Sequence, residues 1–248
     1  DISVDVDHLI LQFEKKNNIT FAESQKDAII SAFQNGIEII TGGPGTGKTT
    51  IIKCIIEIFE TCGLKVLLGA PTGRAAKRMS ESTGKEATTI HRMLDMGVFE
   101  KEESVFVTNA EEHSLEADVV IIDEASMIDI TLMNALLKSI KVGTRLIIVG
   151  DVDQLPSVGA GNVLNDFIES GFTKVVRLKE IFRQGKESMI VVNAHKINKG
   201  EMPKLNEKGT DFFFIRNDIQ EGILNTIIDL INTRLPKFNS NWDKLKSI

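Results

Sequence analysis

Residues 37–50 read IEIITGGPGTGKTT, and the rest of the architecture can be worked out from this stretch. Its first five residues are typical of a buried strand, and a glycine-rich turn from Gly42 to Gly47 follows at once. A helix that begins at Lys48 carries isoleucines at helical spacing. With Lys48 and Thr49 the turn matches GxxxxGK[ST] in full, between a strand and a helix as that motif requires. The stretch therefore predicts a phosphate-binding loop.

The alternation of apolar strand and helix continues along the chain. Strands are predicted at residues 37–41, 65–70, 119–122, 145–149 and 174–178, and helices at 5–16, 22–34, 48 onward, 73–82, 129–140 and 160–170. Apolar strands that alternate with helices indicate a parallel sheet covered on both faces. We therefore expect an α/β fold, a doubly wound and mainly parallel sheet flanked by helices. Ligands of such sheets bind beyond the carboxyl ends of the strands, where Gly42, Pro71, Asp123 and Gly150 fall.

Composition narrows the class of protein. The 248 residues are 42% hydrophobic and 26% charged, close to the globular average, and no apolar run approaches the roughly 18 residues of a membrane span. The net charge of −6 excludes a chain that is basic throughout, but it leaves room for a local basic groove. Cys54 and Cys62 lie about 12 Å apart along one expected helix, too far for a disulfide. These features favour a cytoplasmic protein without a membrane partner.

The phosphate-binding loop predicts ATP and Mg²⁺ as cofactors. Its glycines let backbone N–H groups face phosphate oxygens, and the helix N-terminus adds a positive dipole at the same place. Lys48 is expected to neutralise the β- and γ-phosphates, and the Thr49 hydroxyl to ligate Mg²⁺. The loop residues predicted to bind the nucleotide are Gly43, Pro44, Gly45, Thr46, Gly47, Lys48, Thr49 and Thr50.

An acid pair follows the third predicted strand, in the sequence VVIIDEAS at residues 119–126. Asp123 is expected to hold Mg²⁺ together with Thr49, and Glu124 to polarise the attacking water. Two adjacent acids alone could be a solvated strand end. Behind four buried aliphatic residues and downstream of a phosphate loop, they indicate hydrolysis and not binding alone.

Three further polar residues are candidates for the same site. Gln154, in VGDVDQLPSVG at residues 149–159, could donate to a γ-phosphate and sense its loss. Arg183 follows the last strand and could reach the γ-phosphate, or be a surface arginine. Gln25 lies shortly before the loop and could read an adenine edge, or be an exposed helix residue. With Lys48, Asp123 and Glu124, residues Gln154 and Arg183 complete the candidate catalytic set.

One basic island stands out on this acidic chain. Residues 65–92 contain six bases and two acids. Thr72, the backbone of Gly73 and the Arg74 side chain would suit sugar–phosphate contacts, which position a nucleic acid without reading its sequence. A solvated basic helix is the alternative. The four histidines have no metal-ligand spacing, so no zinc site is predicted.

Two segments depart from the strand–helix rhythm. Between Gly97 and Asp118 lie seven acids and one base around a strand-like Ser104–Thr108, which fits either a small inserted hairpin or a solvated loop. After Gln184 the sequence predicts a helix at residues 186–199, a strand at 211–215 and a helix at 219–234. These elements are too few for a core of their own, so they are expected to begin a second domain.

Six motifs occur in an order that resembles the RecD/TraA-type DNA helicases of superfamily 1. They are GGPGTGKTT (42–50), APTGRAAKRM (70–79), ATTIHRML (87–94), IIDEASMID (121–129), GDVDQLPSVGAGNVL (150–164) and LKEIFRQ (178–184). FAESQKDAI (21–29) and NAHKINKGEMP (193–203) are also similar to that family. The pairing of GDVDQLPSVG with DEAS is the most specific part of the resemblance, because a phosphate loop alone would indicate only an NTPase.

The resemblance implies a RecA-like P-loop NTPase fold and several residue roles. It implies that Gln25 reads adenine, that residues 97–116 form a pin that splits duplex strands, and that movement is 5′ to 3′. It also implies single-stranded DNA and duplex junctions as partners, with nuclease-complex partners left open. The residues that it implies for DNA contact are Pro71, Thr72, Gly73, Arg74, Thr89 and His91.

The resemblance also implies a domain division. Residues 1–35 would be a helical lead, residues 36–180 the first RecA-like motor domain, and residues 181–248 the beginning of an incomplete second one. Because the later family motifs are missing here, this chain is expected to be the ATP-binding half of an ATP-dependent DNA helicase involved in DNA repair or recombination. One alternative is an ATP-gated single-stranded DNA binding module without efficient hydrolysis, and another is an NTPase that acts on protein or small molecules.

Overall fold

The computed structural model describes residues 4–96, 114–180, 188–207 and 211–238. The chain divides into two compact units, residues 1–202 and 203–248, and each is described by itself. The expected insertion near residues 97–116 falls mostly outside the described residues, and Arg183 falls there entirely.

The first unit is built on a six-stranded sheet in which every pairing is parallel. The strands are β1 (Ile37–Thr41), β2 (Val66–Ala70), β3 (Ala87–Thr89), β4 (Val119–Ile122), β5 (Arg145–Gly150) and β6 (Lys174–Arg177). Their order across the sheet is β3-β2-β4-β5-β1-β6. The strand β3 was not predicted, because three residues of sequence Ala-Thr-Thr carry no apolar run. The expected doubly wound, mainly parallel sheet is confirmed.

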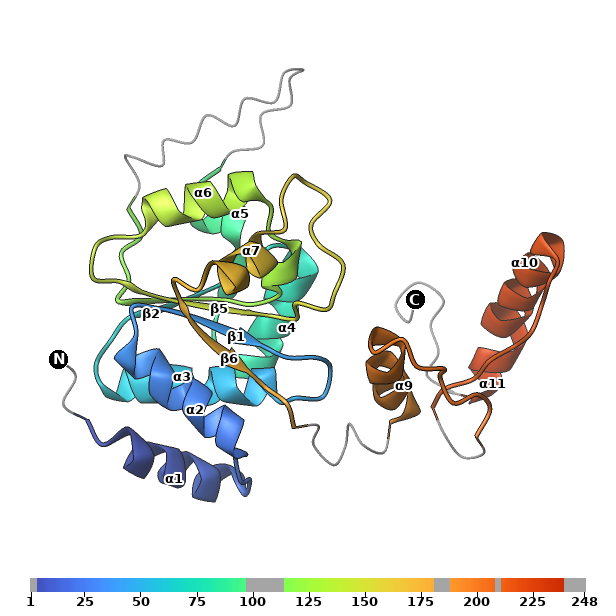
Figure 1. Ribbon diagram of the computed structural model, residues 1–248, viewed down its shortest axis with the longest axis horizontal. Coiled ribbons are helices and arrows are strands. Elements are labelled where there is room, and N and C mark those ends of the chain that lie inside the picture. Colours follow the sequence, from blue (N-terminus) through green and yellow to red (C-terminus); the bar gives the residue numbers. More distant parts are fainter. Residues whose placement is uncertain (1–3, 97–113, 181–187, 208–210, 239–248) are drawn as a thin grey trace, which may run out of the picture. The chain divides into compact units, whose positions relative to one another are not determined.

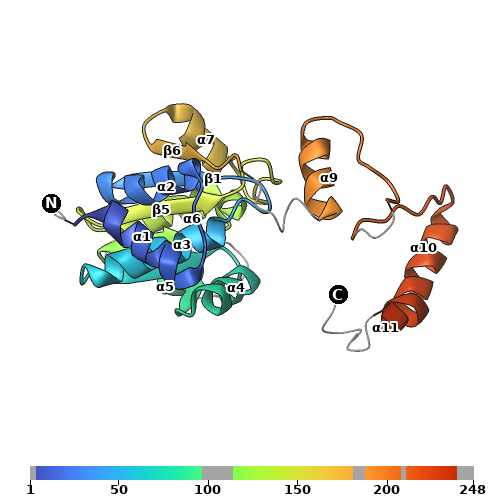
Figure 2. The ribbon, with the colours of Figure 1, turned by 90° about the horizontal axis from the view of Figure 1, so that it is seen from below.

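Helices cover both faces of this sheet (Figure 1). The first layer holds α1 (Val6–Asn17), α2 (Glu23–Gln34), α3 (Lys48–Thr61) and α4 (Gly73–Thr83), and the second holds α5 (Ile90–Met93), α6 (Ile130–Ser139) and α7 (Val163–Ser170). The strands send Ile40, Ile121, Ile147 and Val149 to the first layer and Ile39, Ile122, Leu146 and Ile148 to the second. This alternation is the two-residue period of a strand buried on both sides. Seen from below, α1 lies in front of the sheet (Figure 2).

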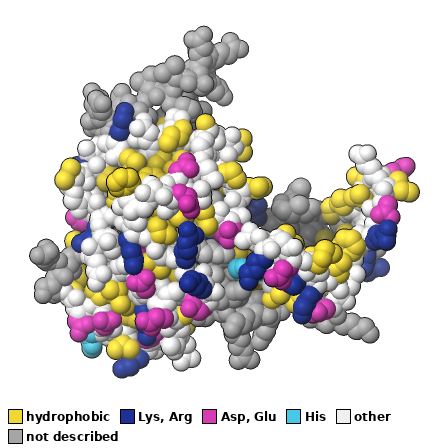
Figure 3. Space-filling view, viewed as in Figure 1, with side chains coloured by type: hydrophobic (Ala, Val, Ile, Leu, Met, Phe, Trp, Pro, Cys, Tyr) yellow, Lys and Arg dark blue, Asp and Glu magenta, His cyan; other side chains and the backbone are white. Residues whose placement is uncertain are grey.

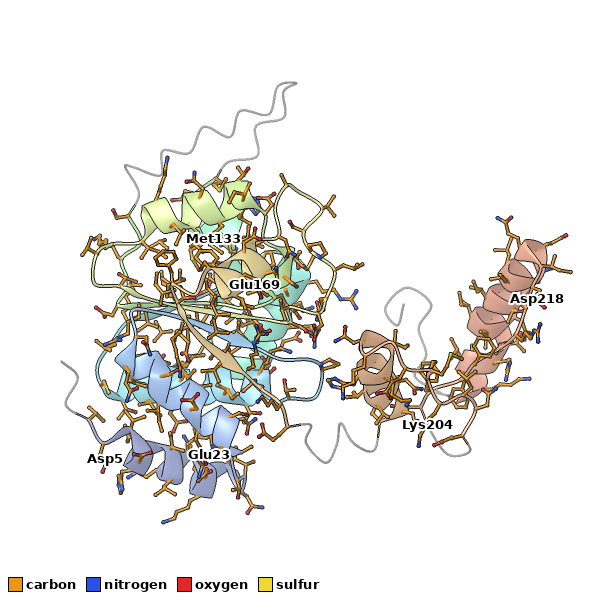
Figure 4. All side chains as sticks on the ribbon, viewed as in Figure 1. Asp5, Glu23, Met133, Glu169, Lys204 and Asp218 are labelled. Carbon is orange, nitrogen blue, oxygen red and sulfur yellow. The ribbon has the colours of Figure 1, made fainter. Side chains whose placement is uncertain are left out.

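Short polar side chains cap the N-termini of several of these helices. Asp5, labelled in Figure 4, accepts a hydrogen bond from the His8 amide at 3.0 Å and begins α1. Asp129 does the same for α6 through the Leu132 amide at 2.8 Å. Such a cap satisfies one of the backbone N–H groups that the first helical turn leaves unpaired. Met133, four residues further on, then lies buried between α6 and the sheet (Figure 4).

The remaining elements follow the sheet in the chain. Helix α9 (Met189–Asn198) lies within the span predicted for it and still belongs to the first unit. The second unit contains α10 (Gln220–Asp229), a π-helical turn (Leu230–Arg234) and α11 (Leu235–Phe238), and no residue of α10 is buried. Among the residues that the structure describes, no helix combines the length and the apolar character needed to cross a bilayer.

The strand predicted at residues 211–215 is wrong, because these residues form no ladder. Phe213 and Phe214 give the segment its strand-like composition, but their side chains are 68% and 49% exposed. A strand is stable only beside another strand, and the described part of the second unit contains none that could pair with it.

The carboxyl group of Glu38 is buried inside the first layer. Glu38 on β1 is fully buried, and Ser31 of α2 donates a hydrogen bond to its Oε1. Its Oε2 has no hydrogen-bond partner. Burial raises the pKa of Glu38 to about 8; the Ser31 hydrogen bond lowers it, the charge of Asp27 raises it, and Lys174 on the neighbouring strand β6 lowers it. The folded chain therefore holds Glu38 as a neutral acid at neutral pH.

Glu38→Gln is expected to remove a pH dependence of stability. Because the folded pKa is raised, its contribution to folding is fully present below the unfolded pKa of 4.5 and is lost as the pH rises through about 8. The wild-type unfolding free energy should fall by about 3 kcal/mol more than that of the variant between about pH 5 and about pH 8. Urea unfolding at several pH values measures this, with Glu23→Gln on the exposed side of α2 as control. Parallel pH profiles for wild type and Glu38→Gln would contradict a buried neutral carboxyl.

Candidate functional site

The phosphate-binding loop connects β1 to α3, as predicted. Gly45 and Gly47 have φ angles of 77° and 83°, in the left-handed region that favours glycine. Gly42 also has no room for a side chain, since a Cβ there would lie 2.9 Å from both the Leu178 Cβ and the Thr46 Oγ1. The Thr46 hydroxyl donates to the Gly43 carbonyl at 2.8 Å and braces the turn. The loop is thus a compact turn that leads directly into a helix N-terminus.

The Lys48 ammonium group folds back over this loop. Its Nζ donates to the carbonyls of Gly42 at 2.5 Å and Gly43 at 3.1 Å. These carbonyl oxygens accept the hydrogen bonds that phosphate oxygens would accept from Lys48 in a nucleotide complex. The lysine is therefore already aimed at the space above the loop.

Gln25 lies beneath the loop and not at the surface. It is 2% exposed, its Nε2 donates to the Thr46 carbonyl at 3.0 Å, and its Oε1 accepts from the Ala22 amide at 3.1 Å. The alternative of an exposed helix residue is wrong. The observed hydrogen bonds give Gln25 a supporting role, because they tie the start of α2 to the phosphate-binding loop.

The acid pair lies at the carboxyl end of β4, beside the loop. The Asp123 amide donates to the Gly69 carbonyl at 3.0 Å, and its Oδ1 accepts from the Glu124 amide at 2.8 Å. Burial raises the pKa of Asp123; the Glu124 amide, Lys48 and Arg78 oppose this rise, while the charge of Glu124 adds to it. Glu124 has a φ of 55°, an uncommon left-handed backbone for a residue with a side chain. Strained backbone of this kind often occurs at functional sites.

These residues line one cleft of about 470 Å³. Its predicted members are Pro44, Gly45, Thr46, Gly47, Lys48, Thr49, Asp123, Glu124 and Gln154. Four residues of α4 complete the lining, namely Ala75, Arg78, Met79 and Ser82, and none of them was among the predicted site residues. Arg78 belonged only to the basic island, because sequence alone does not tell which face of α4 turns toward the loop.

The donor set of this cleft fits a nucleoside triphosphate with Mg²⁺. The loop and the α3 N-terminus offer backbone donors, and Lys48 adds a positive charge at the same place. Thr49 and Asp123 could supply the hard oxygen ligands that Mg²⁺ prefers, and Mg²⁺ usually keeps waters and phosphate oxygens for its other positions. Gln154 is exposed on the loop after β5, whereas its neighbour Asp151 is buried.

The segments predicted to contact a nucleic acid come together at the next strand ends. Strands β2 and β3 are parallel neighbours with Ala70 opposite Thr89, so the segments 71–74 and 89–91 leave the same edge of the sheet. Thr72 and Thr89 begin α4 and α5 by accepting hydrogen bonds from the amides of Ala75 and Arg92, each at 3.2 Å. Gly73, Arg74 and His91 are exposed beside them. We call these two segments the basic ledge.

Surface charge elsewhere does not form a second basic region on the face that Figure 3 displays. Acidic and basic side chains are interspersed there among hydrophobic and neutral ones. This mixed pattern agrees with a net charge of −6, and the island at residues 65–92 remains the local basic feature identified by composition.

His195 of α9 is a neighbour of the loop that the sequence did not single out. Its Nε2 lies 3.2 Å from the Pro44 carbonyl oxygen, and a Cβ on Gly43 would approach its Cε1 to 2.6 Å. A histidine without metal-ligand spacing gives no sequence signal for such a contact. The segment NAHKINKGEMP, which contains it, was recognised only by its resemblance to a family.

Comparison with known proteins identifies relatives of this chain. Residues 25–160 match the family described as AAA domain. The ATP-dependent RecD2 DNA helicase of Deinococcus radiodurans is 36% identical over 204 residues, which are 82% of this chain and 27% of that protein. The RecBCD enzyme subunit RecD of Mycolicibacterium smegmatis is 37% identical over 187 residues, which cover 66% of this chain and 33% of the subunit. The chain thus spans about a third or less of these relatives.

Solved structures agree on the fold. The Pif1 helicase of Candida albicans superposes with a TM-score of 0.54 and 23% sequence identity, over 75% of this chain and 46% of that one. A Pif1 helicase structure concerned with unwinding at forked double-stranded DNA gives a TM-score of 0.51 at 21% identity, over 73% of this chain and 48% of that one. These similarities support the RecA-like arrangement of the sheet and its helices.

Gln25→Ala is expected to destabilise the chain without any nucleotide. The change leaves the Thr46 carbonyl and the Ala22 amide without their partner, at a cost of about 1–3 kcal/mol in the unfolding free energy. Urea unfolding measures this, with Gln34→Ala at the exposed end of the same helix as control. A residue that only reads adenine would leave the nucleotide-free stability unchanged, and that result would contradict the supporting role.

Proposed function

The chain belongs to the AAA domain family, and we propose that it is the ATP-binding part of an ATP-dependent DNA helicase. The resemblance of its sequence to RecD-type helicases is confirmed by the named relatives. The observation that carries the proposal is the cleft in which the phosphate-binding loop, the acid pair and Gln154 meet. Such a constellation serves hydrolysis of a nucleoside triphosphate, because it combines hydrogen-bond donors for the phosphates, ligands for a metal ion and a general base for the attacking water.

Each side chain has a definite part in this proposal. ATP and Mg²⁺ supply the phosphoanhydride bond to be cleaved and the charge that neutralises its oxygens. Lys48 exchanges its loop carbonyls for β- and γ-phosphate oxygens, while Thr49 and Asp123 hold the metal. Glu124 accepts a proton from the attacking water, and Gln154 donates to the γ-phosphate and responds to its loss. Arg183 is proposed to approach the γ-phosphate, and Gln25 to face adenine while it supports the loop.

The basic ledge is the proposed track for single-stranded DNA. Arg74 and His91 are exposed there, and the N-terminal ends of α4 and α5 offer backbone N–H donors beside them. Contacts of this kind go to sugar and phosphate, so binding should depend strongly on salt and weakly on base sequence. Pro71, Thr72, Gly73 and Thr89 complete the contact set. Movement along the strand is proposed to run 5′ to 3′, with duplex junctions as further partners.

We propose the same division of the chain that the sequence resemblance implies. Residues 1–35 lead into a first motor domain at 36–180, which carries the inserted pin near 97–116. Residues 181–248 begin a second RecA-like domain, and its Arg183 would complete the nucleotide site. A cytoplasmic protein of DNA repair or recombination, with or without nuclease-complex partners, is consistent with relatives named for the RecBCD enzyme.

Steady-state ATPase activity with and without oligo-dT tests the proposal, beside Glu124→Gln. A rate that DNA stimulates and that Glu124→Gln abolishes is the expected result for a motor domain that couples the two sites. ATP binding with negligible turnover in both proteins would favour the ATP-gated DNA-binding module instead. No ATP binding at all would overturn the proposed function.

Lys48→Ala is expected to abolish ATP binding and to leave DNA binding intact. The change removes the charge that faces the phosphates, but it lies on a different loop from the basic ledge. Fluorescence anisotropy with labelled oligo-dT and titration with a fluorescent ATP analogue measure the two affinities. Lys53→Ala is the matched control, since Lys53 is exposed on the same helix and does not line the cleft. Unchanged nucleotide affinity in Lys48→Ala would contradict the assignment of Lys48 to the phosphates.

A further inference from the structure

Helix α4 turns one complete face into the nucleotide cleft. Ala75, Arg78, Met79 and Ser82 follow the spacing of three, four and seven residues that places side chains on one side of a helix. Three of these residues are small or apolar and shape the wall. Arg78 is the exception, a long cationic side chain on a wall that otherwise carries no charge.

Arg78 lines the same cleft as Lys48. Among the described residues that line the cleft, these two are the cations. Thr49 and the acid pair line this cleft too, so Arg78 shares it with the groups proposed to face the terminal phosphate and the metal.

Arg78 also differs from its neighbour on the helix. Lys77 does not line the cleft, and it forms an ion pair with Glu81 one turn along α4. In the described part of the chain Arg78 has no ion pair, although Asp123 and Glu124 line the same cleft. An exposed arginine that lines an anion site without an ion-pair partner is available for a phosphate, which its planar donors can engage in bidentate fashion.

We propose that Arg78 binds the terminal phosphate of the bound nucleoside triphosphate, as a cation supplied from within the same domain. The proposal rests on the proposed function of the cleft. It goes further, because α4 begins at Thr72–Arg74 of the basic ledge. One helix of 11 residues therefore joins the phosphate contact to the DNA contact, so that occupation of either site biases the position of the other.

Affinities for a triphosphate and a diphosphate test this directly. The probes are mant-labelled AMPPNP and mant-labelled ADP, each with Mg²⁺, titrated into wild type, Arg78→Ala, Arg78→Lys and the control Lys77→Ala. We expect Arg78→Ala to weaken the triphosphate analogue about tenfold and the diphosphate less than twofold, because only the former has the contacted phosphate. Arg78→Lys should recover part of the loss, and Lys77→Ala should match wild type.

A second readout separates a phosphate contact from a general effect on folding. In wild type, oligo-dT should shift the affinity for mant-AMPPNP, and by linkage mant-AMPPNP should shift the affinity for oligo-dT by the same factor. Arg78→Ala should reduce both shifts together while binding of oligo-dT alone remains.

The possible results distinguish a failure of the Arg78 assignment from a failure of the proposed function. If wild type binds neither nucleotide, the proposed function fails, and the inference falls with it. If wild type binds both and Arg78→Ala discriminates between them as wild type does, the inference alone is overturned. Equal loss of both nucleotides in Arg78→Ala would also overturn it, because that pattern assigns Arg78 to the shape of the cleft and not to the terminal phosphate.

Discussion

Parallel pairing of the strands is the constraint from which the site follows. When every strand runs in the same direction, every carboxyl end lies on the same edge of the sheet, and each following loop starts there. The phosphate-binding loop, the acid pair and the Gln154 loop follow β1, β4 and β5, three strands that are consecutive in the order of the sheet. Residues about a hundred positions apart in the chain thus converge, and the Val152 amide donates a hydrogen bond to Thr41 Oγ1 at 3.2 Å between two of these segments.

Burial on both faces separates stability from chemistry in this fold. The strands bury alternate residues in two helical layers, so the apolar contacts that stabilise the first unit lie away from the strand ends. Polar and strained residues can then accumulate at one edge at little cost to the core. The left-handed backbone of Glu124 and the two left-handed glycines of the loop are examples. Helix α4 belongs to both regions, since Met79 packs in the first layer and also lines the cleft.

Much of this arrangement could be predicted because its signals are local. The strand–turn–helix of the loop, the aliphatic run before Asp123 and the strand periods all lie within short windows of sequence. Orientation was harder to predict: the burial of Gln25, the inward face of α4 and the contact of His195 with Pro44 depend on how elements pack. The edge strand β3 and the missing strand at 211–215 show the same limit, since pairing and not composition decides whether a strand forms.

The hydrogen bonds of Lys48 to its own loop have a consequence for the choice of anion in solution. An ammonium group that already has the carbonyls of Gly42 and Gly43 as partners exchanges them for phosphate oxygens. The net gain is a difference between two sets of hydrogen bonds. Small tetrahedral oxyanions such as sulfate and inorganic phosphate can make the same exchange at the same helix N-terminus. Buffers that contain them therefore compete with nucleotide for the loop, whereas chloride buffers leave its intrinsic selectivity visible.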